Sequence, residues 1–412
     1  MKPRILVIPN TSSWILGDMA RKIIAAHADR FEFRYLSELT ARARPDLLRR
    51  LADEVDVIHA LTEVIAARVW DVIDASTPVV TWIHHVCEWR PEHQRAVERS
   101  VHIVACTQGW RDAILELAPS AAVTVVEHGV DAQRFRRKSI DRASFDLPND
   151  AFVVGIIGSR FSDLDGNRKG LDTLRSVVHA ANPDVRSMHV VFVGPGWDDE
   201  VSHLRADGIS ASALGFLPAA RLPDVYSALD AYLMTSRVEG GPCTILEAMA
   251  CETPVVATRV GLVEDVLCGA FARFTAPAGD APGLTKALIE LSALDASERA
   301  RVGRQFRDCV VQTRQWSQTL RPLAPVYESA AASARTSAEA RRNGHDVGRE
   351  IATVSAADAL IGSTHAVLHA PAALGTSVRM FRSMTADLSS GDVLRGAALL
   401  GGALTARIRR NR

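Results

Sequence analysis

The stretch 236–261, SRVEGGPCTILEAMACETPVVATRVG, decides the fold prediction for this chain. The apolar run before it, 230–235 (DAYLMT), is short and bounded by polar residues, which is typical of a buried parallel strand. A second run of this type follows at 255–257. Between them lie a glycine loop and a helical pattern. The stretch therefore predicts a strand–loop–helix–strand unit of an α/β sheet.

The loop of this unit has the features of a phosphate site. Glu239 is followed by Gly240 and Gly241, and two positions without side chains let a ligand approach the backbone. Pro242 suits the first position of a helix, where a missing N–H costs nothing. A helix over 242–251 directs its free N–H groups and the positive end of its dipole at the loop. We expect phosphate to bind there.

Two carboxylates, Glu239 in the loop and Glu247 on the second helical turn, lie eight positions apart. Both can face one crevice, where they would accept hydrogen bonds from the hydroxyl groups of a sugar and a ribose. Glu247 lies among apolar residues and needs a hydrogen-bond partner. The alternative is that the first carboxylate caps the helix and the second lies at a packing edge.

The run E-G-G-P-C-T-I-L-E-A-M-A resembles the Glu-x7-Glu signature of family 4 glycosyltransferases, which have the GT-B fold. The resemblance implies that Glu239 contacts the donor sugar and Glu247 the nucleotide ribose. It also implies that the donor meets the backbone of the residues between them, which are Gly240, Gly241, Pro242, Cys243 and Thr244, although Pro242 has no N–H. Glu252 departs from the pattern, which has glycine at that position.

Length and composition limit the other possibilities. A chain of 412 residues is expected to form two domains. A formal net charge of zero argues against bulk nucleic-acid binding. The six cysteines form no C-x-x-C motif and indicate reduced thiols of a cytosolic protein. We see neither a signal peptide nor an apolar run of 18 residues, so we expect no membrane-spanning helix.

The first part of the chain alternates short apolar runs with helical or loop segments. The runs at 4–9, 56–59, 79–83, 101–106 and 122–127 predict a mostly parallel sheet. A polar loop containing Gly17 follows the first run, and a helix is predicted over 19–28. One glycine is a weak dinucleotide-binding signal. The resemblance implies that this loop lies at the interdomain cleft, so Gly17 is a candidate site residue.

Two histidines end the 79–83 run, and ligands of such sheets gather at the carboxyl ends of strands. A histidine at a strand end is more often structural. The segment resembles the family's P-V-V-x-T-x-H pattern, which implies that His84 lies near the reacting sugar and acceptor, with His85 as the alternative. Further on, His128-Gly129-Val130-Asp131 resembles the N-G-V-D turn that ends the family's first domain, with His128 in place of asparagine. We interpret it as a turn before a linker.

The run 151–157 restarts the alternation and is followed by Arg160 and Lys169. The resemblance implies that these two cations grip the donor's diphosphate; because the spacing is about four residues longer than usual, Arg168 is an alternative to Lys169. Two cations near a helix N-terminus would stabilise a diphosphate leaving group. The insert contains Asp163 and Asp165, a D-x-D pattern that binds metal in another glycosyltransferase fold. We interpret it as a solvated loop and expect no metal cofactor.

The remaining segments complete the domain prediction. After the strand 189–194, the loop around Phe216 resembles the one that holds the nucleotide base, and Phe216 is a base-contact candidate or a core residue. The segment 316–327 resembles the last helix of GT-B proteins, which crosses back onto the first domain. We therefore predict Rossmann-like domains over 1–142 (acceptor) and 143–312 (nucleotide-sugar), a crossover helix over 313–330 and an Ala/Arg-rich helical or flexible tail over 331–412.

The tail contains eleven arginines against six acidic residues. In its last twenty residues, apolar positions recur at helical spacing among the arginines. Such a helix suits an anionic membrane surface. A dimer contact, or packing on the chain's own domains, is the alternative.

These observations predict an α/β GT-B protein with two mostly parallel sheets and an interdomain cleft. By resemblance, it transfers a sugar from a nucleotide-sugar to a glycan or lipid-linked acceptor, with retention and without metal. We expect a cytoplasmic location, at most peripheral on the inner face of the plasma membrane, and a role in polysaccharide biosynthesis. A nucleotide-sugar epimerase or hydrolase with this fold, or a non-catalytic nucleotide-sugar-binding protein, is the alternative.

Overall fold

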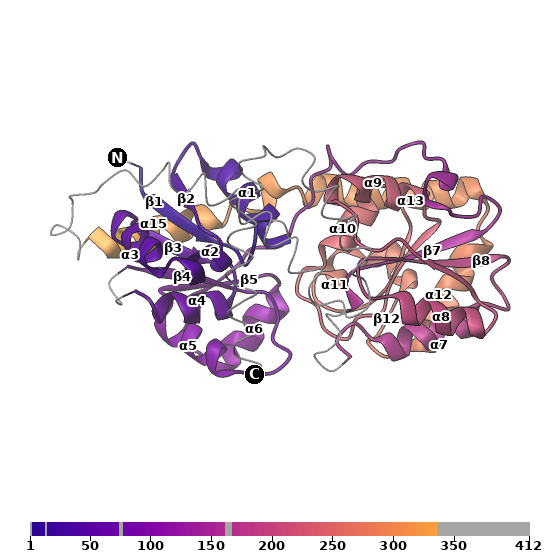
Figure 1. Cartoon of the computed structure of the whole chain (residues 1–412), viewed down its shortest axis with the longest axis horizontal. Helices are drawn as coiled ribbons and strands as arrows, with labels where there is room; N and C mark the ends of the chain where they lie inside the picture. Colours follow the sequence, from indigo (N-terminus) through magenta and orange to yellow (C-terminus); the bar gives the residue numbers. More distant parts are fainter. Residues whose placement is uncertain (1, 13–14, 74–76, 161–166, 336–412) are drawn as a thin grey trace, which may run out of the picture.

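The computed structural model describes residues 2–12, 15–73, 77–160 and 167–335. The predictions for Asp163 and Asp165, and for the tail beyond residue 335, lie outside the described residues. The described chain forms two α/β lobes side by side (Figure 1).

The first domain is built on a parallel sheet with the strand order β2-β1-β3-β4-β5-β6. Its strands are β1 (Arg4–Ile8), β2 (Glu32–Tyr35), β3 (Val57–Ala60), β4 (Val79–Ile83), β5 (His102–Ala105) and β6 (Val123–Val125). Its helices are α1 (Ile15–His27), α2 (Glu38–Ala43), α3 (Pro45–Glu54), α4 (Glu63–Trp70), α5 (Pro91–Arg99) and α6 (Gln108–Leu117).

The second domain has a parallel sheet of the same size, in the order β12-β11-β10-β7-β8-β9. Its strands are β7 (Phe152–Ile157), β8 (Met188–Val193), β9 (Ser210–Ala213), β10 (Ala231–Met234), β11 (Val255–Thr258) and β12 (Thr275–Ala276). Its helices are α7 (Leu171–Ala181), α8 (Asp198–Ala206), α9 (Leu222–Ala228), α10 (Cys243–Ala250), α11 (Val263–Val266), α12 (Ala281–Ala293) and α13 (Ala296–Thr313). The two parallel α/β sheets confirm the predicted fold class.

Local sequence explains why these elements begin where they do. The central strands are apolar on both faces because helices cover both sides of the sheet, and β8 is buried along its whole length. Thr62 and Thr107 cap α4 and α6 by accepting the N–H groups of Ile65 and Trp110. Asp295 and Glu298 form a capping box at the start of α13.

The last described helices return the chain to the first domain. α14 (Trp316–Thr319) leads into α15 (Leu323–Arg335), and Figure 1 shows α15, in orange, among the indigo elements β1 and β3. Leu323 and Tyr327 are fully buried in the same apolar cluster as Ile5 and Trp82. Removing this apolar surface from water fastens the C-terminal end of the second domain to the first.

Four local features differ from the sequence predictions. The short strands β2, β9 and β12 were not predicted, because they are brief and mixed in polarity. α1 begins at Ile15, so Gly17 lies within the helix instead of the loop before it. Pro242 is the N-cap of α10 and not its first helical residue. The side chains of Val130 and Phe135 already pack in the core of the second domain, well before the predicted division at residue 142.

The described residues contain no helix long and apolar enough to cross a lipid bilayer.

Candidate active site

The candidate site lies where the strand order of the second sheet reverses. β8 and β9 follow β7 on one side, whereas β10, β11 and β12 lie on the other. The loops after β7 and β10 therefore diverge at their carboxyl ends, and a crevice forms there in open α/β sheets. The loop after β7 carries Arg168 and Lys169, and the loop after β10 carries Glu239. Neighbouring strands thus bring together residues that are about 70 positions apart.

Backbone contacts hold the two cations beside the end of β10. The Arg237 N–H donates to the Arg168 carbonyl at 2.7 Å, and the Thr235 hydroxyl lies 3.1 Å from both the Lys169 and Gly170 carbonyls. Gly170 has a φ of 66°, and a side chain there would meet the Thr235 carbonyl oxygen. This close approach requires glycine.

The Glu239 carboxylate is the centre of the cluster. Its Oε1 accepts hydrogen bonds from Lys169 Nζ at 2.5 Å and from Ser236 Oγ at 2.9 Å, and its Oε2 lies 3.3 Å from Arg168 Nη1. Burial tends to raise the pKa of Glu239, but the charges of Lys169 and Arg168 outweigh it and hold that pKa below its usual value. Glu239 is therefore an ionised, almost fully buried carboxylate between two cations.

The carbonyl groups of residues 239–241, here called the donor loop, are all bound by protein. Trp110 Nε1 donates to the Glu239 carbonyl at 3.0 Å, Leu262 N–H donates to that of Gly240 at 2.9 Å, and His128 Nδ1 donates to that of Gly241. Trp110 and His128 belong to the first domain. The donor loop is thus held against the first domain at two points.

The N–H groups that follow have no such partners. Within the described part of the chain, no backbone acceptor takes the N–H groups of Gly241, Cys243 and Thr244. The last two lie at the N-terminus of α10, whose dipole favours an anion. A glycine at 241 is required because a side chain would collide with the His128 ring. The sequence prediction of a phosphate cradle here stays a prediction, and the backbone arrangement favours it.

Glu247 lies deeper in α10 and meets Tyr226. The Tyr226 hydroxyl donates to Glu247 Oε2 at 2.9 Å, which supplies the partner that the sequence required. Burial raises the pKa of Glu247 to about 7, against the lowering effects of the Tyr226 hydrogen bond and the Arg134 charge. The carboxylate is therefore poised between its two forms near neutral pH.

The structure places the adjacent residues His84 and His85 in different surroundings. Both ring nitrogens of His84 are bound inside the protein: Nε2 lies 2.9 Å from the Leu61 carbonyl, and Nδ1 lies 3.1 Å from His128 Nε2. Its ring also stacks on Trp82. The His85 ring lies in the field of the cluster, and burial together with the Arg168 charge lowers its pKa to about 4. Among the described residues its nitrogens have no hydrogen-bond partner.

The other candidate residues lie at separate places. Gly17 is buried in the first turn of α1, where a side chain would meet the Thr11 and Ser12 carbonyls. Glycine at this position therefore allows the backbone of residues 11–12 to lie close against the helix. Phe216 is half-buried in the loop after β9. Arg160 is placed by its N–H, which donates to the Pro195 carbonyl at 3.1 Å. Among the described residues, no hydrogen bond or ion pair joins the Arg160 side chain to the Glu239 cluster, so its diphosphate role stays a prediction.

Sequence reasoning missed three groups that shape the site. Trp110 and His128 hold the donor loop, and Ser236 bonds to Glu239. The only signal was the replacement of asparagine by His128 in the turn that resembles N-G-V-D. No sequence pattern indicated Trp110, because its contact joins residues 129 positions apart.

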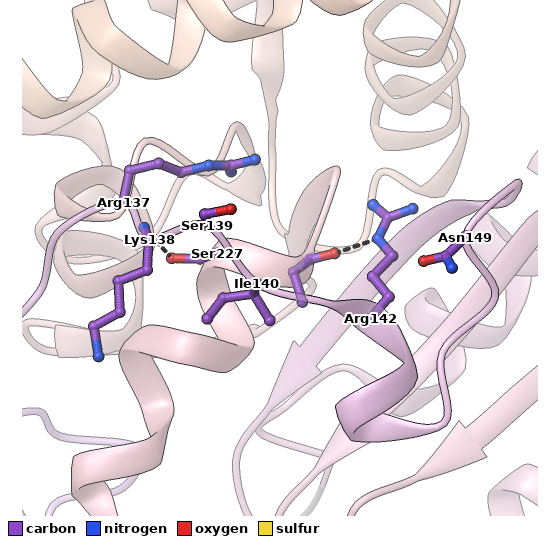
Figure 2. A pocket seen from close by; sticks show the side chains of 8 residues that line it. Arg137, Lys138, Ser139, Ile140, Arg142, Asn149 and Ser227 are labelled. Carbon is purple, nitrogen blue, oxygen red and sulfur yellow. Dashed lines mark hydrogen bonds between the residues drawn. The ribbon is translucent and has the colours of Figure 1, made fainter.

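A cavity of about 600 Å³ lies on the interdomain linker, and none of the cluster residues lines it. Figure 2 shows Lys138 and Arg142 at opposite ends of it, with Ile140 between them. Lys138 pairs with Asp224 at 2.6 Å, and Arg142 pairs with Asp230 at 2.5 Å. The charges of Lys138 and Arg142 are therefore already compensated by these two carboxylates.

The described residues contain no group of three or more His, Cys, Asp or Glu side chains that is suited to hold a metal ion.

Known proteins resemble this chain in sequence, most clearly over its second domain. Residues 151–293 match the family model described as Glycosyl transferases group 1. The chain is 30% identical over 267 residues to a D-inositol 3-phosphate glycosyltransferase of Saccharomonospora viridis, covering 60% of this chain and 59% of that relative. It is 28% identical over 250 residues to the lipopolysaccharide core biosynthesis mannosyltransferase LpsB of Rhizobium meliloti, covering 56% and 66%.

The chain has the GT-B fold, and its second domain is similar in sequence to the group 1 glycosyl transferases. Its fold resembles that of Anabaena HepE in complex with UDP-glucose, with a TM-score of 0.64 and 19% identity, over 80% of this chain and all of HepE. It also resembles sucrose-phosphate synthase of Thermosynechococcus elongatus, with a TM-score of 0.63 and 16% identity, over 81% of this chain and all of that one. Matches to the curated relatives span between 41% and 66% of their lengths.

Proposed function

We propose that this protein is a family 4-like glycosyltransferase that moves a sugar from a nucleotide-sugar to a hydroxyl group of a glycan or lipid-linked acceptor. The observation that carries the proposal is the Glu239 carboxylate, buried between Lys169 and Arg168. Beside it are the N–H groups at the start of α10, for which the described residues provide no backbone acceptor. Cations, helix N–H groups and a carboxylate suit the diphosphate and hydroxyl groups of such a donor.

The chemistry follows from the charges. The bond between the anomeric carbon and the diphosphate oxygen breaks, and negative charge develops on the leaving diphosphate. Lys169 stabilises that charge, which a metal ion would otherwise neutralise, and the more deeply buried Arg168 holds the Glu239 carboxylate in place. Glu239 accepts hydrogen bonds from the donor sugar and Glu247 from the ribose. The acceptor oxygen forms the new bond to the anomeric carbon, and its proton passes to the leaving diphosphate. We assign retention of configuration by the resemblance, and no nucleophile.

The relatives suggest where to begin. HepE is described in complex with UDP-glucose, so uridine diphosphate is the first nucleotide to test. The names of the curated relatives suggest inositol phosphate and lipopolysaccharide core acceptors. Attachment to a membrane surface through the arginine-rich end of the chain, or a dimer contact there, belongs to the same proposal.

Nucleotide binding tests the donor site directly. We expect one of UDP, GDP, ADP and dTDP to raise the melting temperature in the presence of EDTA, because a ligand at 100 times its Kd contributes about 2.7 kcal/mol. Glu247→Gln should remove most of this shift. In the wild type, nucleotide affinity should fall as the pH drops through about 7, because protonated Glu247 loses acceptor capacity for the ribose.

The stability of the free protein provides the control for Glu247. Its pKa is higher in the folded chain than the ordinary value of 4.5, so the folded protein holds the extra proton between pH 4.5 and 7 and loses stability as the pH rises through that window. Glu247→Gln should therefore melt higher than the wild type at pH 8 without nucleotide. A shift that requires manganese and survives Glu247→Gln would contradict the proposed site.

The two histidines are expected to differ in kinetics. His85→Ala should reduce kcat at least tenfold with little change in nucleotide affinity, because the His85 imidazole lies in the field of the cluster and has no hydrogen-bond partner among the described residues. His84→Ala opens a cavity beside Trp82 and removes two internal contacts, so it should lower the melting temperature. Steady-state kinetics and thermal melts of both variants separate the roles. A kinetic loss confined to His84→Ala at unchanged stability would support His84, as the resemblance implies, and contradict the role of His85.

A further inference from the structure

Three contacts of the His84 and His128 rings link the interior of the first domain to the donor loop. His84 Nε2 contacts the Leu61 carbonyl at 2.9 Å, His84 Nδ1 faces His128 Nε2 at 3.1 Å, and His128 Nδ1 contacts the Gly241 carbonyl. Gly241 lies two positions after Glu239. This series of contacts therefore ends at the donor loop, which contains Glu239.

Two neutral rings, those of His84 and His128, carry one proton too few to make all three contacts hydrogen bonds. A carbonyl oxygen can only accept, so the nitrogens that face Leu61 and Gly241 must each carry a proton. A neutral imidazole has a single proton, and both are then used. The facing nitrogens of His84 and His128 would present two lone pairs to each other at 3.1 Å. One additional proton between them turns this repulsive contact into a hydrogen bond.

The shortage disappears when the donor loop leaves the first domain. His128 Nδ1 then meets water, which can donate to it, and His128 is free to carry its proton on Nε2 and donate to His84 Nδ1. Two neutral rings satisfy the two remaining contacts. The docked loop therefore needs three ring protons, whereas the undocked loop needs two.

We propose that His128 is a positioning residue that docks the donor loop on the first domain, and that docking takes up one proton, which the His84–His128 pair holds. The inference rests on the proposed function, because it concerns the same donor site. Trp110 provides the second contact between the loop and the first domain, and its indole does not titrate. The proton dependence of docking is thereby assigned to the histidines.

The groups around the two rings set the pKa of the His84–His128 pair. Burial lowers the pKa of both rings, and the Gly241 carbonyl opposes this for His128. The Glu239 charge raises the pKa of His128, whereas His59 and His85 lower that of His84. Two thiols also face the pair: Cys243 Sγ lies 3.6 Å from His128 Nδ1, and Cys106 donates to the His84 carbonyl. Protonation therefore falls on the acid side of the ordinary histidine pKa of about 6.5.

The difference of one ring proton between the docked and undocked loop sets the direction in which docking depends on pH. The docked pair has the higher proton affinity, because docking places the Gly241 carbonyl, which can only accept a hydrogen bond, against His128 Nδ1. Docking is therefore favoured below the pKa of the undocked pair and weakens as the pH rises through that of the docked pair. The limiting slope is tenfold per pH unit for one proton.

Nucleotide affinity tests the inference. UDP, or another nucleoside diphosphate if it stabilises the wild type more, is titrated calorimetrically into wild type, His128→Asn and the exposed control His179→Asn between pH 5.5 and 8. Asparagine is chosen because the resembled turn contains it and because it cannot hold the proton. At pH 5.5 we expect His128→Asn to bind about tenfold more weakly than wild type, with the ratio shrinking at least threefold by pH 8.

The ratio is used because Glu247 titrates in both proteins and cancels. His179→Asn should follow the wild type at every pH. A wild-type to His128→Asn ratio that does not change with pH would overturn the proton-linked docking. Equal affinities at every pH would also remove His128 as a positioning residue. In kinetics, the loss should appear in KM for the donor, with kcat within about threefold.

A spectroscopic measurement keeps this inference separate from the proposed function. ¹⁵N spectra of histidine-labelled protein, assigned with His84→Asn and His128→Asn, report the protons on each ring nitrogen without any ligand. We expect one shared extra proton on the pair as the pH falls below 6.5, and its loss in either variant. Two neutral rings down to pH 5 in the folded protein would overturn the inference. If no nucleotide binds the wild type, the proposed function fails and this measurement still decides the proton count.

Discussion

Replacing Glu239 with glutamine is expected to reduce sugar transfer by about 10²- to 10³-fold while nucleoside diphosphate binding stays equal or becomes tighter. The carboxylate accepts hydrogen bonds from Lys169 and Ser236 and lies against Arg168. Glutamine keeps the shape and removes the charge, so the donor sugar loses its acceptor. The two cations lose their counter-charge and become more available to a diphosphate.

This change should also weaken the free protein. Removing one partner of a buried ion pair leaves the remaining charges uncompensated, which costs about 3 kcal/mol where both are fully buried. Lys169 is 31% exposed, so the loss here should be smaller. A saturating diphosphate should restore much of the melting temperature, because it replaces the missing negative charge.

Glu264→Gln provides the matched control, since Glu264 is an exposed carboxylate in the same domain. Transfer kinetics, calorimetric titration with the nucleoside diphosphate and thermal melts should be made on both variants. If Glu239→Gln loses nucleotide affinity in parallel with transfer, Glu239 acts on the nucleotide or on folding instead of on the sugar.

Replacing Lys169 with alanine should have the second-largest effect, a fall in transfer of about 10²-fold together with weaker diphosphate binding. The Lys169 side chain is 31% exposed at the cluster, whereas the Arg168 side chain is more deeply buried, with 14% exposed. A partly exposed cation can turn from Glu239 to an arriving diphosphate at a lower cost in buried contacts.

A comparison of the two cations decides which of them grips the leaving group. Lys169→Ala should lower kcat and nucleotide affinity, whereas Arg168→Ala should mainly lower the melting temperature. Lys286→Ala is the control, because Lys286 is 78% exposed on α12 and far from the cluster in the chain. A larger loss of kcat in Arg168→Ala, at equal stability, would transfer the diphosphate role to Arg168.

The sequence by itself determined the architecture and the loop that carries the site. The alternation of apolar runs with helical segments predicted parallel α/β sheets, because strands covered on both faces must be apolar along their length. The spacing of Glu239 and Glu247 around two glycines located the donor loop, since local pattern determines a strand–loop–helix unit. The short strands β2 and β12 escaped prediction because a few residues of mixed polarity have no periodicity to detect.

Only the tertiary structure decided how the site is assembled. The resemblance favoured His84 over His85, but the sequence does not show what packs against either ring, because adjacent strand-end residues point to opposite sides. Packing on Trp82 and the contact with His128 turned His84 inward. The pairing of Lys169 with Glu239 joins loops 70 positions apart, and the Trp110 contact joins two domains. Such pairs depend on which strands become neighbours, and that is a property of the whole packed sheet.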